Sequence, residues 1–483
     1  MTLVRNTAVA LAVAALAATA STASAAPVHV LRDGEVKVVS DPYLPAGEPQ
    51  LPPTLASPAP AAHRGAAARA AAKRVTVTRA LRTLRDEGAI TPEDYRARAR
   101  TWAEAKQSLR KLTGRREVEL GAIVRSTEAL ASGGGLTAGR LPVVFEIVAR
   151  NREWWTTGSL LAYGARARFT GSRIVWQSYP GNGLQPQWLG TFGEANAFWK
   201  SKKRGALRQL LDEAVALASP RAGGIAWESF FAFSGAPPVW VSALSQGTGI
   251  QALSRGSQLL ERPDLLEAAK AALGVFATDA PEGVRVPTKA GAHYLIYSTN
   301  ERLRVLNGFL QSLNGLFDYS DISGDPDGLR LFEAGDAQAR VEVPQYDTGE
   351  WSLYEGSRES DLGYHQLVRQ FLENLCERTA VDVYCATATE FEQQETRPPV
   401  LRIRTTRGRT KAPVPVEFTL SKISTVSLYV NDVPIASARL GRGTHTLTWA
   451  GRRKAGDVNV RLDATDLAGN KASVAKIVTL RRK

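Results

Sequence analysis

The hydrophobic pattern of this chain changes its period near residue 397, and one fold cannot contain both patterns. Before this point, apolar residues recur at the three- and four-residue spacing of amphipathic helices. After "ETRPP" they alternate with period two, as in "VSLYVNDVPIASARL" and "GDVNVRLDATDLAGN". Because the two periods bury different sets of side chains, we expect a mainly helical region followed by a separate β-domain.

The region with period two spans residues 398–483. It predicts about seven short strands separated by Gly, Asp and Asn turns, which is typical of a β-sandwich. The stretch "DATDLAGNK" resembles the Ig-like modules of bacterial envelope and secreted proteins. We therefore expect a spacer or a surface-binding appendage here rather than a catalytic unit.

The N-terminal residues predict export from the cell. Arg5 precedes a short apolar run, and small residues ending in "ASA" complete a signal peptide over residues 1–25. Residues 26–74 are rich in Pro and Ala and predict a disordered linker. The apolar run is too short for a membrane span, and no other stretch reaches the roughly 20 apolar residues that a span needs.

Two helical regions follow the linker. Residues 75–140 predict an N-terminal helical region, in which Thr91 and Pro92 mark a helix start. Residues 141–395 combine serial amphipathic helices with a β-hairpin and a small β region. Serial helices with polar, aromatic-rich connections favour an α-helical toroid, an (α/α) barrel-like domain with its site at one end. The predicted fold class is thus multidomain α+β, with a toroid and a C-terminal Ig-like β-sandwich.

The chain contains two cysteines, Cys376 and Cys385. A metal site would need further His or Cys ligands, and none lies nearby in the sequence. An oxidising compartment favours a disulfide between the two, which would pin the end of a helix.

The formal net charge of +14 is concentrated in two flanks. Residues 64–117 hold 15 Lys or Arg against 6 Asp or Glu, and residues 397–483 hold 18 against 5. Everything else is therefore net acidic. Because export argues against nucleic acid as a partner, the basic flanks favour an acidic polysaccharide or an anionic polymer of the cell envelope. A solvated Arg-rich surface without a partner is the alternative.

Four stretches of the main domain combine Tyr, Gly, Asn and Arg in an unusual way. They are "YPGNGLQPQWLGTFGEANAFW" (179–199), "ALSQGTGIQALSRG" (243–256), "YSTNERLRVLNGFLQSLNGLFDY" (297–319) and "YDTGEWSLYEGSRESDLGYHQL" (346–367). In this order they resemble the D-glucuronyl C5-epimerase family, including the enzymes that act on heparan sulfate precursors. The resemblance covers residues 140–393 and leaves both flanks outside it.

The resemblance implies an isomerase that inverts C5 of D-glucuronate residues in an extracellular polysaccharide. This reaction removes a proton α to a carboxylate and returns one to the opposite face, so two tunable acid–base groups suit it. A phenol has an ordinary pKa near 10, so cations or hydrogen bonds must stabilise its anion. No metal or organic cofactor is required. A structural calcium ion is compatible with this interpretation, although no cluster of ligands stands out in the sequence.

The resemblance also assigns roles to individual residues. Tyr297, Tyr354 and Tyr364 correspond to the family's catalytic tyrosines. Arg358 corresponds to an arginine that would neutralise the substrate carboxylate. Further candidates for substrate binding are Asn307, His365, Gln185, Gln187, Gln246 and Tyr346.

These assignments have structural alternatives. The tyrosine rings could serve packing alone, and a surface ion pair with Glu355 or Glu359 would account for Arg358. A satisfied structural histidine is the more common state of a residue such as His365. The chain also departs from the family pattern. Ile296 stands where the animal enzymes carry an acidic residue, and Tyr354 and Tyr364 are only ten residues apart.

Other functions stay open at this point. A hydrolase would use a pair of carboxylates, for which Glu228, Asp347 and Glu350 are available. A lyase would share the abstraction of the C5 proton and then eliminate the C4 substituent. A non-catalytic glycan-binding protein would keep the fold without turnover. In each case we expect a uronate-containing polysaccharide as partner, with the cell envelope as a further partner and a homodimer as one assembly.

Overall fold

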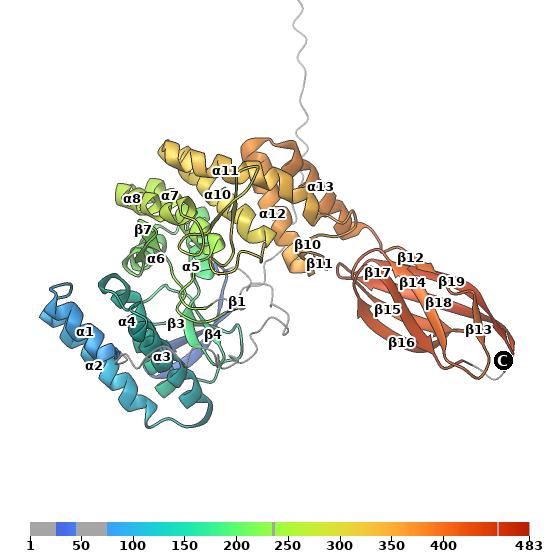
Figure 1. The fold of residues 1–483 in the computed structure, drawn as a ribbon, viewed down its shortest axis with the longest axis horizontal. Coiled ribbons are helices and arrows are strands. Elements are labelled where there is room, and N and C mark those ends of the chain that lie inside the picture. The colour runs from blue at the N-terminus through green and yellow to red at the C-terminus, as the bar shows by residue number, and fades with distance from the viewer. Residues whose placement is uncertain (1–25, 45–74, 234–236, 452–453, 483) are drawn as a thin grey trace, which may run out of the picture.

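The computed structural model describes residues 26–44, 75–233, 237–451 and 454–482. Figure 1 shows a helix-rich body with an elongated β-domain beside it. The multidomain α+β class is therefore confirmed, whereas the toroid and the Ig-like topology stay predictions. The predicted signal peptide lies outside the described residues, and so does most of the predicted linker.

The helices of the body follow the predicted periodic segments closely. They are α1 (Val77–Asp86), α2 (Pro92–Leu109), α3 (Gly114–Ser132), α4 (Leu141–Thr157), α5 (Trp188–Lys200), α6 (Arg204–Ala216), α7 (Ala243–Leu260), α8 (Pro263–Ala272), α9 (Gly274–Ala277), α10 (Leu306–Ser323), α11 (Pro326–Glu342), α12 (Leu362–Thr379) and α13 (Asp382–Thr396). The predicted start at Thr91 is a capping box, in which the side chains of Thr91 and Asp94 bond each other's backbone amides. In the described part of the chain, no helix is both long enough and apolar enough to cross a membrane.

The first part of the predicted linker is a β-hairpin, so that part of the prediction is wrong. Strands β1 (Ala26–Arg32) and β2 (Glu35–Asp41) are joined by Asp33 and Gly34, which both have positive φ angles. Asp-Gly with this backbone is a favoured two-residue hairpin turn. The Pro- and Ala-rich composition of the following residues masked this short alternating pattern.

This hairpin extends a sheet of the helix-rich body. Strand β1 pairs in parallel with β3 (Arg166–Phe169), and β4 (Trp176–Tyr179) and β5 (Gly183–Pro186) complete the order β2-β1-β3-β4-β5. A single hydrophobic core then runs from Leu31 to Phe391 and includes residues of α1. The boundary predicted at residue 140 therefore does not divide the core.

Helices α7 and α10 pack together through glycines of two motif stretches. A Cβ atom on Gly247 would lie 2.5 Å from the Cα of Ser312. One on Gly315 would lie 2.0 Å from the carbonyl oxygen of Gly247. Backbones at this separation exclude any side chain at either position. The close contact fixes where α10 begins.

Short hairpins connect the helices of the body. The pairs are β6 (Ser219–Arg221) with β7 (Gly224–Ala226), β8 (Arg285–Pro287) with β9 (Ala292–Tyr294), and β10 (Leu353–Glu355) with β11 (Arg358–Glu359). The hairpin β8–β9 confirms the one predicted from "GVRVPTKAGAHYLIYS". A disulfide joins Cys376 near the end of α12 to Cys385 in α13, which confirms that prediction too.

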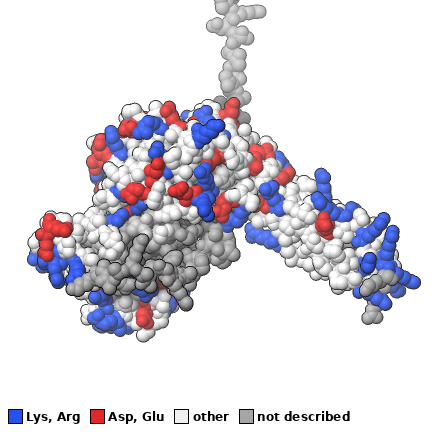
Figure 2. Space-filling model, viewed as in Figure 1, with Lys and Arg blue, Asp and Glu red and all other residues white. Residues whose placement is uncertain are grey.

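The β-domain consists of two sheets around a core of its own. Its strands are β12 (Leu401–Ile403), β13 (Arg407–Arg409), β14 (Val414–Leu420), β15 (Ser424–Val430), β16 (Val433–Leu440), β17 (Gly443–Trp449), β18 (Gly456–Asp466) and β19 (Lys471–Arg481). They form the sheets β12-β14-β17 and β13-β19-β18-β15-β16. Buried side chains alternate with exposed or half-buried ones along β14 and β18, as the period-two pattern predicts. Lys and Arg gather at the far end of this domain (Figure 2).

The β-domain is attached to the helix-rich body through a buried lysine. The Nζ atom of Lys422 lies 2.8 Å from Asp466 Oδ2 within the β-domain, and both side chains are buried. The same ammonium donates to the carbonyl oxygens of Gln394 and Arg397 at the end of α13. It also lies 5.2 Å from the centre of the Trp351 ring. Lys422 thereby links the two bodies.

Removing this lysine should destabilise the protein strongly, because Asp466 would be left as a buried charge without its main partner. We expect Lys422→Met to lower the free energy of unfolding by about 3–5 kcal/mol in urea titrations. The double variant Lys422→Met, Asp466→Asn should recover part of this loss. Equal unfolding midpoints for the single variant and the wild type would contradict the role given to Lys422.

Candidate active site

Two of the predicted tyrosines are in direct contact. Tyr354 lies in β10 and Tyr364 in the first turn of α12, and their ring centres are 4.8 Å apart in an edge-to-face arrangement. The carboxylate of Asp361 caps α12 by accepting a hydrogen bond of 2.8 Å from the amide of Tyr364. Tyr364 is fully buried, whereas Tyr354 is partly exposed.

The hydroxyl of Tyr364 lies at the start of α10. It accepts a hydrogen bond of 3.2 Å from the amide of Asn307 and donates one of 3.4 Å to the carbonyl oxygen of Tyr354. Burial raises the pKa of Tyr364 well above its ordinary value, and the amide of Asn307 opposes this shift. Amides in the first turn of a helix carry partial positive charge, which favours a negative oxygen at this point.

Arg358 lies above the same pair of rings. Its guanidinium carbon is 4.3 Å from the centre of the Tyr354 ring, which is a cation–π contact. Its Nη2 atom is also 3.1 Å from Glu355 Oε1, so the predicted ion pair with Glu355 is present as well. The Arg358 side chain is 34% exposed and can therefore still meet a ligand.

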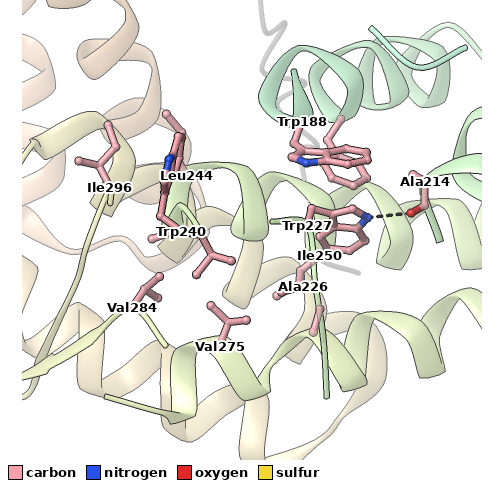
Figure 3. Close-up of a cluster of buried hydrophobic side chains, with 14 of the residues drawn as sticks. Trp188, Ala214, Ala226, Trp227, Trp240, Leu244, Ile250, Val275, Val284 and Ile296 are labelled. Carbon is pink, nitrogen blue, oxygen red and sulfur yellow. Dashed lines mark hydrogen bonds between the residues drawn. The ribbon is translucent and has the colours of Figure 1, made fainter. Parts of the chain in front are cut away.

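Tyr297 lies in a separate aromatic cavity beside α10. Its ring contacts Trp240 and Phe233 at centre distances of 5.1 and 5.9 Å. The cavity measures about 40 Å³. Figure 3 shows several of its walls, with Ile296, Leu244 and Trp240 at one side and Trp188 and Trp227 at the other.

Ile296 connects Tyr297 to the start of α10. A Cβ atom on Gly308 would lie 3.3 Å from the Cβ of Ile296, so this side chain packs against the first turn of α10. That turn also carries Asn307, which bonds Tyr364. The structure thus brings Tyr354, Tyr364 and Asn307 together, whereas Tyr297 lies in a different cavity and is linked to them only through Ile296. The isoleucine has a packing role where the family pattern expects an acid.

His365 does not fit its predicted role in substrate binding. Its side chain is fully buried, and its ring stacks on Trp351 at 4.0 Å. Nδ1 accepts from the Ser352 amide, and Nε2 lies 2.9 Å from the carbonyl oxygen of Phe391. Both nitrogens are therefore occupied, and burial lowers the pKa of His365. The neutral ring packs against Trp351 and bonds Ser352, which directly precede β10.

The three candidate glutamines lie in different places and have different hydrogen-bond partners. Gln246 is buried, and its side chain bonds the backbone amide and carbonyl of Trp227. Gln185 is buried, donates to the carbonyl oxygen of Asn182 and lines a cavity next to α3 and α4 instead. Gln187 lines the Tyr297 cavity, while its Oε1 atom caps α5 by accepting from the Gly190 amide.

Two other candidates lie near the tyrosine pair. The hydroxyl of Tyr346 donates to the carbonyl oxygen of Arg304 at 3.0 Å, and burial raises its pKa. Tyr346 is therefore tied to the protein. By contrast, the Oδ1 atom of Asn307 is buried and has no hydrogen-bond partner within the described part of the chain.

The carboxylates considered for a hydrolase are engaged in structural contacts. Glu228 is buried and pairs with Arg140 at 2.7 Å and with Arg221 at 2.8 Å. Asp347 Oδ1 accepts from the amide of Gly349 and from a glutamine of α13. Glu350 Oε2 lies 3.3 Å from a serine hydroxyl of the β-domain. None of these contacts leaves the pair of free carboxylates that a hydrolase requires.

The sequence did not single out several residues that hold the site together. Trp351 and Ser352 support His365, and Lys422 contacts Trp351 from the β-domain. Phe233 and Trp240 lie in "FFAFSGAPPVW", whose density of aromatic residues was an available signal. Nothing in the sequence around Lys422 indicated its role, because its partners are distant along the chain.

The lowered pKa of His365 makes a prediction about stability. The unfolded chain, where the imidazole pKa is about 6.5, binds a proton that the folded protein rejects. The contribution of His365 to stability is therefore complete above that pH and is lost as the pH falls toward the folded pKa. Glu194, whose burial raises its pKa to about 7, acts in the opposite sense.

A matched variant separates these two effects. We expect the free energy of unfolding of the wild type, measured in urea at about pH 5 and pH 7, to fall more at the lower pH than that of His365→Gln. The contribution of Glu194 is common to both proteins and cancels. Equal pH dependence in the two proteins would show that His365 is not held neutral by its surroundings.

Comparison with known proteins shows that the region of the site is similar to one family. A model described as the D-glucuronyl C5-epimerase C-terminus matches residues 223–393, which contain all three tyrosines. The D-glucuronyl C5-epimerase of Caenorhabditis elegans is 34% identical over 132 residues, covering 25% of this chain and 21% of the relative. An uncharacterized protein of Methanocaldococcus jannaschii is 24% identical over 151 residues, covering 30% and 49%. The chain thus spans about a fifth and about half of these two relatives.

Solved structures give weaker similarities. A D-mannose isomerase matches with a TM-score of 0.34 and 13% identity, over 43% of this chain and 58% of the isomerase. An endo-β-1,4-glucanase from Acetobacter xylinum matches with a TM-score of 0.35 and 13% identity, over 47% and 74%. Similarity at this level supports no inference about activity. Residues 223–393 of this chain are similar to the D-glucuronyl C5-epimerase C-terminus, as the family model and the C. elegans relative both indicate.

Proposed function

We propose that this protein inverts C5 of D-glucuronate residues within an extracellular polysaccharide, by proton transfer through tyrosines. The observation that carries the proposal is the Tyr354–Tyr364 pair, which lies at the first turn of α10 beneath Arg358. The similarity of residues 223–393 to the epimerase family supports the reaction class. The engaged carboxylates give a hydrolase no comparable support.

Tyr354 is the group that exchanges a proton with C5 on one face of the sugar. It is the more exposed ring of the pair, and Arg358 places a positive charge 4.3 Å from its centre. A cation beside a phenol stabilises the phenolate, which is the form that can accept a proton. The same guanidinium is available to the substrate carboxylate, where it would stabilise the enolate-like charge of the transition state.

Tyr364 acts as a positioning residue in this mechanism. Because its pKa is raised by burial, it keeps its proton and donates to the backbone of Tyr354. Inversion also needs an acid–base group on the opposite face of the sugar, and we assign this role to Tyr297. Its chain neighbour Ile296 packs against the first turn of α10, which carries the amide that bonds Tyr364, and this supports the assignment.

Export and substrate class belong to the same proposal. The disulfide between Cys376 and Cys385 supports folding in an oxidising compartment. The basic flanks suit a polymer that carries a carboxylate on its uronate residues. Contact of these flanks with the cell envelope, and a homodimeric assembly, remain predictions.

Removing the hydroxyl of Tyr354 tests its proposed role in proton transfer. We expect Tyr354→Phe to lower kcat at least about 100-fold, because the proton-transfer group is lost. KM should change by less than about threefold, since the ring and Arg358 remain. Activity is measured as loss of deuterium from a polysaccharide labelled at C5 of glucuronate.

Tyr319→Phe is the matched control. This buried tyrosine donates to Asp325 at the opposite end of α10, so its variant also loses one hydroxyl but leaves the site intact. Equal losses of kcat in both variants would contradict the role of Tyr354. New unsaturated ends in the product would identify a lyase, and new reducing ends without unsaturation would identify a hydrolase.

A further inference from the structure

A cleft of about 670 Å³ lies between the hairpin β10–β11 and the β-domain. The hairpin contributes Ser357, Arg358 and Glu359 to its walls. The β-domain contributes residues at the end of β14 and just before β17, including Ser421 and Arg442. The cleft is therefore formed by two bodies that are far apart in the sequence.

The walls of this cleft are held at a fixed separation. The carboxylate of Glu359 accepts a hydrogen bond of 2.8 Å from the amide of Ile423 and one of 2.6 Å from the amide of Arg442. Both oxygens of Glu359 are thus bound by the β-domain backbone. Ser421 adds a bond of 3.3 Å to Glu350. Because these contacts use backbone amides and a hydroxyl, they leave the arginine side chains of the cleft available.

The two arginines of the cleft differ in their partners. Arg358 pairs with Glu355 and lies over Tyr354, so it belongs both to the cleft and to the tyrosine site. The side chain of Arg442 is exposed, and it forms no ion pair with any residue that the structure describes. A polymer that presents one carboxylate to Arg358 would reach Arg442 with a neighbouring part of its chain. Arginine binds carboxylates in a bidentate manner.

We propose that this cleft is a second carboxylate-binding subsite, which holds a uronate residue farther along the polymer than the reacting residue and its immediate neighbours, and recognises it through Arg442. The inference rests on the proposed function, because it takes the same polysaccharide as ligand. It also assigns the β-domain a direct part in substrate binding, beyond the spacer or surface appendage that the sequence predicts.

The test compares short and long oligomers of glucuronate. A trimer fills the tyrosine site alone, whereas an octamer also reaches the cleft. We expect the wild type to bind the octamer more tightly by isothermal titration calorimetry. Arg442→Gln should weaken the octamer about tenfold and leave the trimer unchanged, because one charged hydrogen-bonded contact is lost. The amide of Arg442 still bonds Glu359 in this variant, so the hairpin stays in place.

Arg409→Gln provides the control. It removes the same charge from the β-domain but lies in β13, which is at the end of the domain away from the helix-rich body (Figure 1). Equal octamer affinity of Arg442→Gln and the wild type would overturn the subsite, and so would equal weakening by both variants. Equal binding of trimer and octamer by the wild type would overturn it too.

A separate measurement tests the proposed function: the exchange of the C5 proton of the octamer by the wild-type protein. If the wild type exchanges the C5 proton but Arg442→Gln binds the octamer as tightly as the wild type does, the subsite is overturned and the epimerase proposal stands. If Arg442→Gln binds the octamer about tenfold more weakly but the wild type exchanges no C5 proton, the subsite is supported and the epimerase proposal is overturned.

Discussion

The site depends on the contact between α7 and α10, where the two backbones touch. Gly247 and Gly315 leave no room for a Cβ atom, so α10 is held against α7 along its length. The position of its first turn follows from this contact. That turn supplies the amide that binds the hydroxyl of Tyr364 and the surface against which Ile296 packs. The glycines of the "SQGTG" and "LNG" motifs thus set the geometry of tyrosines that lie elsewhere in the chain.

A series of contacts leads from α10 through the tyrosines to the β-domain. Tyr364 positions Tyr354, and Tyr354 lies on a hairpin that Glu359 ties to the β-domain. On the inner side, His365 stacks on Trp351, and Lys422 of the β-domain reaches the same tryptophan. The hairpin with the tyrosine is therefore supported from two directions. A short hairpin needs such support to hold the proposed proton-transfer group in place.

The sequence predicted the parts of this structure that have a local signal. Helical periodicity, the helix start at Thr91, the hairpin near residue 290 and the disulfide are all local, and each is confirmed. The three tyrosines were found through motif resemblance. Contacts between segments that are distant along the chain could not be predicted. Gln246 and His365 look like polar site residues in the sequence, but burial and backbone partners from distant segments occupy them. The role of Lys422 could not be predicted for the same reason.

The most direct test of the account follows solvent deuterium into the product of the wild-type protein. A glucuronate polysaccharide is incubated in deuterated water, and the C5 positions of both epimers are followed by NMR during the first turnovers. Transfer through separate groups on the two faces predicts that new iduronate carries deuterium at C5, with the chain length unchanged. Iduronate that keeps the original proton would contradict the two-face arrangement of tyrosines. Label that enters only as the chain is cleaved would contradict the epimerase.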